Sequence, residues 1–371
     1  MHLKNIRLTQ FKNFSKVQVE FSPEINCLVG NNGSGKTNLL DAVHYLCLTK
    51  SAFNAVDVQN IMHDHLFFSL KGEFSMGNKS LEIKCLLETG KKKQVVINGK
   101  PYEKMSDHIG LLPIVLIAPD DTQLIREGSE ERRKFFDGLL SQLDKNYLNN
   151  LIRYHSFLKQ RNALLKQFAE NNRIDRLLLE PYDKELIGLS ILIAQRRADF
   201  MLSYAPLLLH HYGNISEYKE IVSIQYESDC LHEEFSQSFQ SSLKKDVLLK
   251  RTNKGIHKDD YNFGIEGYPL KKFGSQGQQK SFLIALKLAQ FHVFKEMKKT
   301  KPILLLDDIF DKLDDHRIKK MMELVANHEF GQLFITDARP ERSRRILQGI
   351  SSNINFYEIN GGDLSEDQSN H

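Results

Sequence analysis

The chain has 371 residues, of which 41% are hydrophobic and 26% charged, and its formal net charge is only +4 at pH 7. This length allows two or three domains, and so small a net charge means that any nucleic-acid site must be a local basic patch. The N-terminus has no signal-peptide pattern, and no run approaches the roughly 20 apolar residues of a membrane span. The four widely spaced cysteines match no zinc pattern and indicate reduced thiols in a cytoplasmic protein. We expect no membrane partner.

The first part of the chain is predicted to be α/β and to be organised around a glycine-rich loop. Alternating or continuous apolar side chains predict strands at residues 6–8, 17–21, 25–29, 81–86, 94–97 and 113–117. After the run 25–29, Gly30 begins the sequence Gly-Asn-Asn-Gly-Ser-Gly-Lys-Thr, which fits the phosphate-loop pattern G-x-x-x-x-G-K-[ST]. An amphipathic helix is predicted to follow, so the motif has the strand–loop–helix context that it requires.

The chemistry of this loop follows from its residue types. Glycines let the backbone approach phosphate closely, and successive N–H groups at a helix N-terminus bind the anion. Lys36 is predicted to reach the β- and γ-phosphates and Thr37 to hold Mg²⁺. The predicted nucleotide-binding residues of the loop are Gly30, Asn31, Asn32, Gly33, Ser34, Gly35, Lys36, Thr37 and Asn38.

From about residue 126 the chain changes character, because glycine and proline become rare and helical patterns dominate. Helices are predicted at residues 130–143, 147–169 and 183–209, with Pro181 as a break before the third, and at residues 231–249, after a strand at 221–226. This stretch is predicted to be a helical insertion within the ATPase domain.

The last third returns to an α/β pattern. A hairpin is predicted at residues 261–270, a helix opening at Ser275, and strands at residues 303–306, 333–335 and 354–359. The polar tail, residues 361–371, is predicted to be disordered.

The strand at 303–306 ends in two carboxylates, which is what a phosphate-loop ATPase needs opposite its glycine loop. Asp307 is predicted to hold Mg²⁺, and Asp308 to orient or activate the attacking water, so that Asp308 and Lys36 are the predicted catalytic residues. Without other evidence, the two aspartates could instead cap a turn. Because the chain also has the loop at Gly30, the two motifs are predicted to lie in one sheet, with an insertion between them in the sequence.

The residues Ser275-Gln276-Gly277-Gln278-Gln279 match the helix-opening signature of ABC-type ATPases, with Gln276 in place of a glycine. In that class Ser275, Gly277 and Gln278 would donate hydrogen bonds to the γ-phosphate held by a second subunit. The sequence therefore predicts an ABC-type phosphate-loop ATPase head of mixed sheets flanked by helices, with an inserted α-helical lobe. The predicted divisions are residues 1–125 and 250–371 for the head and 126–249 for the lobe.

In these motifs the chain resembles the RecF family of bacterial recombination mediators, within the SMC/Rad50-like ABC ATPase superfamily. The resemblance spans nearly the whole chain. It is carried by residues 8–14, 30–38, 118–121, 128–129, 132–137, 154, 158–166, 257–260, 273–280 and 304–314. Lys258 stands where the family usually has arginine.

The resemblance implies an ATP- and Mg²⁺-dependent protein of DNA repair and replication, including the SOS response. Such a protein would dimerise on ATP, hydrolyse it slowly as a switch, and bind single-stranded, double-stranded and gapped DNA. It would load recombinase with RecO and RecR. The predicted DNA contacts are Lys159, Arg161 and Lys166, for which a solvated helix face is the alternative. Phe11, Lys12 and Phe14 are candidates for the adenine contact.

Two other functions fit the motifs less well. An SMC- or Rad50-like chromosome-structure ATPase would carry arms of hundreds of residues or a hook with a metal-binding cysteine pair. An ABC transporter ATPase would need a membrane partner, and it usually has glutamate where this chain has Asp308.

Overall fold

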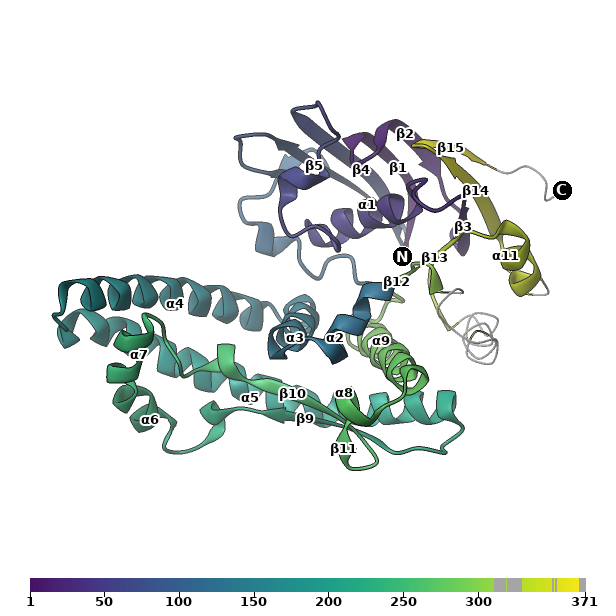
Figure 1. Ribbon diagram of the computed structural model, residues 1–371. Coiled ribbons are helices and arrows are strands. Elements are labelled where there is room, and N and C mark those ends of the chain that lie inside the picture. The colour runs from purple at the N-terminus through teal and green to yellow at the C-terminus, as the bar shows by residue number, and fades with distance from the viewer. Residues whose placement is uncertain (310–317, 319–328, 349, 351, 367–371) are drawn as a thin grey trace. The chain divides into compact units, whose positions relative to one another are not determined.

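The computed structural model describes residues 1–309, 318, 329–348, 350 and 352–366, and Figure 1 shows the path of the chain. The chain divides into two compact units. The first comprises Met1–Asp121 and Leu286–His371, and the second comprises Thr122–Ala285. Among the described helices, none has both the length and the apolar character needed to cross a bilayer.

In its described residues, the first unit contains two six-stranded sheets. The antiparallel sheet has the order β2-β1-β4-β5-β6-β7. Its strands are β1 (His2–Phe11), β2 (Phe14–Glu20), β4 (Phe67–Met76), β5 (Lys79–Glu88), β6 (Gln94–Ile97) and β7 (Lys100–Pro101). The other sheet has the order β15-β14-β3-β13-β12-β8 and is parallel except for β15. Its strands are β3 (Ile25–Val29), β8 (Ile114–Ile117), β12 (Ile303–Leu306), β13 (Leu333–Asp337), β14 (Ile354–Asn360) and β15 (Asp363–Glu366).

Helix α1 (Lys36–Leu48) packs against strands of both sheets, and one hydrophobic cluster joins them. Strands β3, β12 and β13 are buried along their whole length, which is typical of parallel strands covered on both faces. Because these three strands are parallel, their carboxyl ends meet at one edge of the sheet. Gly30 follows β3 at this edge, and Asp307 follows β12. The unit also contains α11 (Pro340–Leu347).

The second unit is mainly helical. Its helices are α2 (Gln123–Arg126), α3 (Ser129–Leu143), α4 (Lys145–Asn171), α5 (Arg176–Ser216), α6 (Phe235–Ser241), α7 (Leu243–Leu249) and α8 (Leu270–Phe273). A three-stranded sheet accompanies them, made of β9 (Val222–Glu227), β10 (Asp260–Ile265) and β11 (Tyr268–Pro269). Helix α9 (Gln276–Lys298) begins in this unit and ends in the first. Short 3-10 helices lie at Asp57–Asn60, Met105–Asp107, Pro119–Thr122, Asp229–Leu231 and Ile256–Lys258.

Several element predictions were wrong in detail. Helix α5 runs unbroken through Pro181 and Pro206, because its buried side chains, such as Leu186 and Ile193, pack against neighbouring elements and outweigh the lost backbone hydrogen bonds. The single helix predicted at 231–249 is instead the pair α6 and α7. Part of the tail predicted to be disordered is strand β15, which pairs with β14; residues 310–314 of the last predicted motif and 367–371 of the tail lie outside the described residues.

Two further differences concern strand pairing. Strand β4 was not predicted, although it pairs along its length with both β1 and β5. Residues 250–285 were predicted to belong to the head, but they lie in the second unit. The reason is that β10, within this stretch, pairs with β9, which lies before residue 250 in the predicted lobe.

Arg161 on α4 is part of the lobe's interior, which corrects the prediction that it contacts DNA. Its side chain is fully buried, with Nε 2.6 Å from Oδ1 of Asp183 and Nη1 2.7 Å from Oδ2 of Asp246. The guanidinium carbon lies 4.8 Å from the ring centroid of Phe239. Helical spacing explains the burial, since positions 154, 161, 165 and 168 share one face and are all buried. Lys159 lies on another face and is exposed.

We therefore expect Arg161→Met to lower the free energy of unfolding by about 3 kcal/mol or more, because it leaves buried Asp246 without its cation. The matched control, Lys159→Met on the same helix, should change it by less than about 0.5 kcal/mol. Urea unfolding followed by circular dichroism measures both. Equal stability of the two variants would contradict a structural role for Arg161.

Candidate functional site

The predicted phosphate loop joins β3 to α1, and two of its glycines are required by close backbone approaches. Gly30 has φ 149°, and a Cβ there would lie 2.3 Å from the carbonyl oxygen of Ile359. Gly35 has φ 117°, and a Cβ there would lie 2.4 Å from Nδ2 of Asn13. Any other residue at either position would displace the surrounding backbone or the Asn13 side chain. The loop geometry therefore depends on glycine.

Lys36, the first residue of α1, directs its ammonium back over the loop. Its Nζ donates to the carbonyl oxygens of Gly30, at 2.8 Å, and Asn31, at 3.0 Å. Only 4% of Lys36 is exposed to solvent. The ammonium of Lys36 thus lies against the loop backbone, which in a phosphate-loop motif surrounds the bound phosphate.

Thr37 and Asp307 come together from opposite ends of the chain. Thr37 Oγ1 donates to Asp307 Oδ1 at 2.8 Å, and Thr336 Oγ1 donates to the same oxygen at 2.9 Å. Neighbouring oxygen ligands of an octahedral Mg²⁺ lie about 2.9 Å apart, given metal–oxygen distances of about 2.0–2.1 Å. The spacing of the Thr37 and Asp307 oxygens therefore fits two adjacent ligands of one such ion.

The environment of Asp307 also favours a cation. Burial raises the pKa of its carboxyl above the ordinary value, and the hydrogen bonds from Thr37 and Thr336 only partly oppose this effect. A buried carboxylate with a raised pKa lacks compensating positive charge, which a divalent ion would supply.

Asp308 adopts a left-handed backbone conformation, with φ 45°. Its N–H donates to Thr336 Oγ1 at 2.8 Å, so one threonine is linked to both carboxylates. Among the protein residues that the structure describes, none hydrogen-bonds to the buried Oδ1 of Asp308. This oxygen is available to accept a hydrogen bond from a water or a ligand, as expected of a residue that orients the attacking water.

Asn13 supports the loop and was not predicted. Its Nδ2 donates to the carbonyl oxygen of Ser34 at 2.9 Å, and its Oδ1 accepts from Nδ2 of Asn38 at 2.7 Å. The residue lies in the tight turn between β1 and β2, and strands β2 and β3 separate it from the loop in the chain. The only available signal was the presence of an asparagine in a hairpin turn just before the motif.

The two aromatic candidates for the adenine contact were wrong. Phe11 and Phe14 are fully buried in the hydrophobic core, so neither ring has a face available to a base. Lys12 is bound to a buried carboxylate, with Nζ 2.6 Å from Oδ2 of Asp41.

The predicted signature forms a capping box at the N-terminus of α9. The Ser275 N–H donates to Oε1 of Gln278 at 2.7 Å, and Ser275 Oγ accepts from the Gln278 N–H at 3.2 Å. Gln278 Nε2 donates to Oε1 of Glu220 at 2.8 Å. Ser275 is exposed, and its hydroxyl proton can still donate to an anion, whereas the amide of Gln278 is held within the lobe.

The two remaining predicted DNA contacts belong to a larger group, here called the basic face. It comprises the half-buried Arg133 and the exposed Lys159, Lys166, Arg251 and Lys258. Lys159, Asn162 and Lys166 share one stripe of α4. Asn162 Oδ1 accepts from both the N–H and the hydroxyl of Thr252, at 2.8 Å each, which places the neighbouring Arg251 beside that stripe.

Charges within the basic face act on one another. Burial lowers the pKa of Lys258 below its ordinary value, and the nearby cations Arg251 and Arg133 lower it further. Within the described part of the chain, no acidic side chain forms an ion pair with any of the five residues. Sequence alone could not assemble the group, because three separate segments contribute to it.

Comparisons with known proteins agree with this fold. Residues 2–352 match the family model described as RecF/RecN/SMC N terminal domain. The chain is 15% identical to a solved Smc head bound to the C-winged helix domain of ScpA, with a TM-score of 0.56 and coverage of 99% of this chain and 97% of that one, which shows the shared fold. The fold and the match define a RecF/RecN/SMC-type head with a helical insertion, as predicted.

Relatives with higher sequence identity identify the family within this class. The DNA replication and repair protein RecF of Cytophaga hutchinsonii is 46% identical over 366 residues, covering 99% of this chain and 97% of the relative. RecF of Flavobacterium johnsoniae is 46% identical over 359 residues, covering 97% and 100%. A solved structure described as the recombination mediator protein RecF-ATP in the RecFOR pathway is 28% identical, with a TM-score of 0.89 and coverage of 99% and 97%. The chain belongs to the RecF family of DNA replication and repair proteins, which confirms the resemblance.

Proposed function

We propose that this chain is an ATP-switched DNA-binding protein of recombinational repair and replication-fork maintenance. The observation that carries the proposal is the contact of Thr37 with Asp307, because it joins two halves of a Mg²⁺–ATP site from distant parts of the chain. The solved relative is described as RecF-ATP, which supports ATP as the ligand.

In the proposed ATP site each residue has a distinct task. Lys36 would exchange its loop carbonyls for phosphate oxygens, and Thr37 and Asp307 would hold Mg²⁺, whose charge would offset that of the β- and γ-phosphates. Asp308 would orient the attacking water through its Oδ1, which has no hydrogen-bond partner among the described residues, and would accept the water's proton. Because aspartate is shorter than the glutamate of transporters, we expect slow hydrolysis, which suits a switch.

We further propose that the signature acts on the nucleotide of a second copy. Ser275 lies exposed at the N-terminus of α9, where its hydroxyl and the helix dipole would favour a γ-phosphate. Two ATP molecules would then join two copies into a homodimer, and hydrolysis would release them.

The basic face is the proposed contact with DNA. Its cations, most of them exposed, form no ion pair with an acidic side chain in the described part of the chain, and such cations would bind the phosphates of single-stranded, double-stranded or gapped DNA without reading sequence. The solved relative is described as a member of the RecFOR pathway, which supports cooperation with RecO and RecR in recombinase loading.

The role of Asp308 predicts that Asp308→Asn traps an ATP-bound dimer. Asparagine tolerates the left-handed conformation with φ 45° and matches aspartate in size, so the site should still close. Its neutral amide would be a poor base, and single-turnover hydrolysis should fall about 10²–10⁴-fold while the dimer lifetime increases. Hydrolysis at the wild-type rate would mean that another residue is the general base. Loss of ATP binding would mean that Asp308 is needed for binding or folding.

The DNA contact is tested by replacing Lys159, Lys166 and Arg251 with glutamate. Each lost phosphate contact should reduce the slope of log affinity against log salt by about 0.9 for duplex DNA, so the triple variant should bind weakly and with a flatter slope. The control carries the same charge change at Lys79, Lys84 and Lys100, three exposed lysines of the first unit. Fluorescence anisotropy on gapped duplex with ATP measures both. Equal slopes in the two variants would exclude the basic face.

A further inference from the structure

Thr336 links the two aspartates of the proposed ATP site through one hydroxyl. The residue lies near the carboxyl end of β13, and its side chain is fully buried. Its Oγ1 donates to Oδ1 of Asp307 at 2.9 Å and accepts from the N–H of Asp308 at 2.8 Å. A hydroxyl has one proton to donate and lone pairs to accept with, so a single oxygen serves both aspartates. Valine, which has nearly the same shape, could make neither hydrogen bond.

The hydrogen bond that Thr336 donates orients the proposed Mg²⁺ ligand. Asp307 Oδ1 also accepts from Thr37, at 2.8 Å, but Thr37 is itself a proposed ligand of the ion. Thr336 is not one, so its hydrogen bond to Asp307 can persist when Mg²⁺ binds. Hydrogen bonds behind a ligating carboxylate fix its orientation, and losing one typically lowers metal affinity or activity about 10–100-fold.

The hydrogen bond that Thr336 accepts holds the backbone of Asp308. Asp308 has φ 45°, a left-handed conformation that residues with a Cβ seldom adopt. Its N–H is bound by the threonine, and its buried Oδ1 has no hydrogen-bond partner among the described residues. The position of this oxygen therefore depends on the backbone conformation that Thr336 stabilises.

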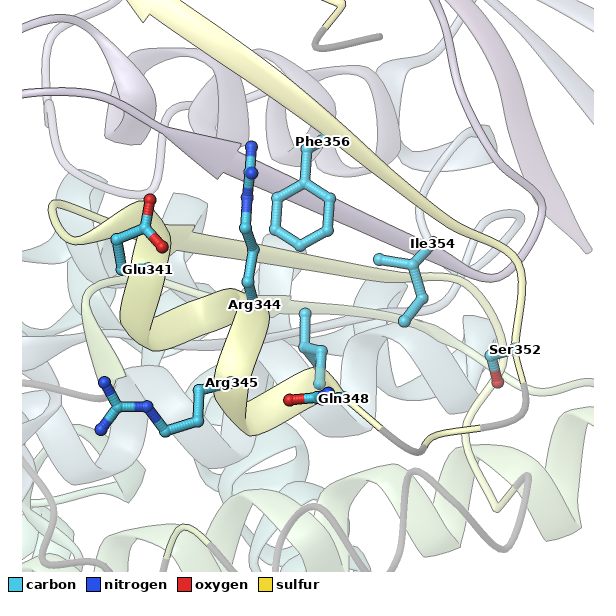
Figure 2. A pocket seen from close by; sticks show the side chains of 8 residues that line it. Glu341, Arg344, Arg345, Gln348, Ser352, Ile354 and Phe356 are labelled. Atoms are coloured by element: carbon cyan, nitrogen blue, oxygen red, sulfur yellow. The ribbon is translucent and has the colours of Figure 1, made fainter. Parts of the chain in front are cut away.

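Helix α11 in turn holds the end of β13. The carboxylate of Asp337, the last residue of the strand, accepts from the Ser343 hydroxyl and lies 2.5 Å from Nη2 of Arg342. Figure 2 shows the same helix beside β14, with Arg344 alongside the ring of Phe356. The guanidinium carbon of Arg344 lies 5.3 Å from the ring centroid. The strand end that carries the threonine is thus tied to a helix that contacts another strand of the same sheet.

We propose that Thr336 is a positioning residue for ATP hydrolysis, which fixes the Mg²⁺ ligand Asp307 and the water-orienting Asp308 relative to each other. This inference rests on the proposed ATP site. The hydroxyl would contact neither the nucleotide nor the attacking water, and it would act only through the two aspartates. The proposed contacts of Lys36 and the loop backbone with phosphate do not use this hydroxyl. Its loss should therefore affect Mg²⁺ affinity and hydrolysis more than ATP binding at saturating Mg²⁺.

The test compares Thr336→Val, which removes the hydroxyl at nearly constant shape, with Thr336→Ser, which keeps it. Binding of a fluorescent ATP analogue to the whole protein is titrated with Mg²⁺, and single-turnover hydrolysis is measured at saturating Mg²⁺. For Thr336→Val we expect a Mg²⁺ midpoint about tenfold higher and hydrolysis about tenfold slower or more, with near-normal analogue affinity at saturating Mg²⁺. Thr336→Ser should behave almost as wild type in both measurements.

Ser22→Ala is the matched control, because the buried Ser22 hydroxyl also donates once and accepts once. It donates to the carbonyl oxygen of Asn353 at 2.7 Å and accepts from the Glu24 N–H at 3.2 Å, at the amino ends of β3 and β14. Both Ser22→Ala and Thr336→Val should lower the urea midpoint of unfolding, but only Thr336→Val should change the Mg²⁺ midpoint and hydrolysis. If Thr336→Val does not fold, Thr336→Cys carries the same prediction, because a thiol is a weak donor and acceptor.

A double variant shows whether Thr336 acts through Asp308. At saturating Mg²⁺, Asp308→Asn combined with Thr336→Val should hydrolyse ATP no more slowly than Asp308→Asn alone, because no base remains to be positioned. Losses that multiply, wild-type behaviour of Thr336→Val, or a Thr336→Ser variant as defective as Thr336→Val would each overturn the inference while the proposed function stands. Normal hydrolysis by Asp308→Asn would instead contradict the proposed function, and the inference with it.

Discussion

The proposed nucleotide site depends on one contact, between the hydroxyl of Thr37 and the carboxylate of Asp307. The contact exists because β3 and β12 run in the same direction on either side of β13, so their carboxyl ends lie at the same edge of the sheet. The order of these strands thus brings the two motifs together in space, although an inserted lobe separates them in sequence.

The same edge concentrates charge in a way that makes the site responsive to its ligand. Asp307 is buried between two threonine hydroxyls, and burial raises its pKa; a cation bound there would stabilise the ionised form. Among the residues that the structure describes, the hydrogen-bond acceptors of Lys36 are backbone carbonyls of its own loop, which are neutral. A phosphate and a divalent ion would supply the missing opposite charge to both groups, so ligand binding should stabilise the folded unit.

Positive residues in the lobe are used in two different ways. Arg161 and Arg197 are buried, and Arg197 Nη1 lies 2.7 Å from Oδ2 of Asp259, in the segment 257–260 that carries part of the family resemblance. In the same segment Asp260 pairs with Arg132 at 2.8 Å, while Lys258 is exposed on the basic face. Buried pairs fix the packing of α4 and α5, and exposed cations remain available to phosphates.

This distinction explains what the sequence could and could not predict. The phosphate loop, Asp307 and the signature helix were recognisable because each motif is local and has a required strand or helix context. The burial of Arg161 was in principle visible from its helical spacing, but charge dominated the interpretation. Asn13, strand β4 and the basic face depend on contacts between distant segments, and no local pattern identifies such contacts.

The central claim, that each nucleotide is bound by the loop of one copy and the signature of another, is tested most directly by mixing two inactive variants. Lys36→Ala keeps an intact signature, and Ser275→Arg keeps an intact loop, so their mixed dimer contains one complete site and one doubly defective site. The measurement is ATP hydrolysis with gapped DNA, for each variant alone and for an equimolar mixture. We predict almost no activity for either variant alone and at most about half of wild-type turnover for the mixture, since only the mixed dimer can close on ATP and it has one complete site of two. An inactive mixture of two folded variants, or normal turnover by Ser275→Arg alone, would contradict the shared site.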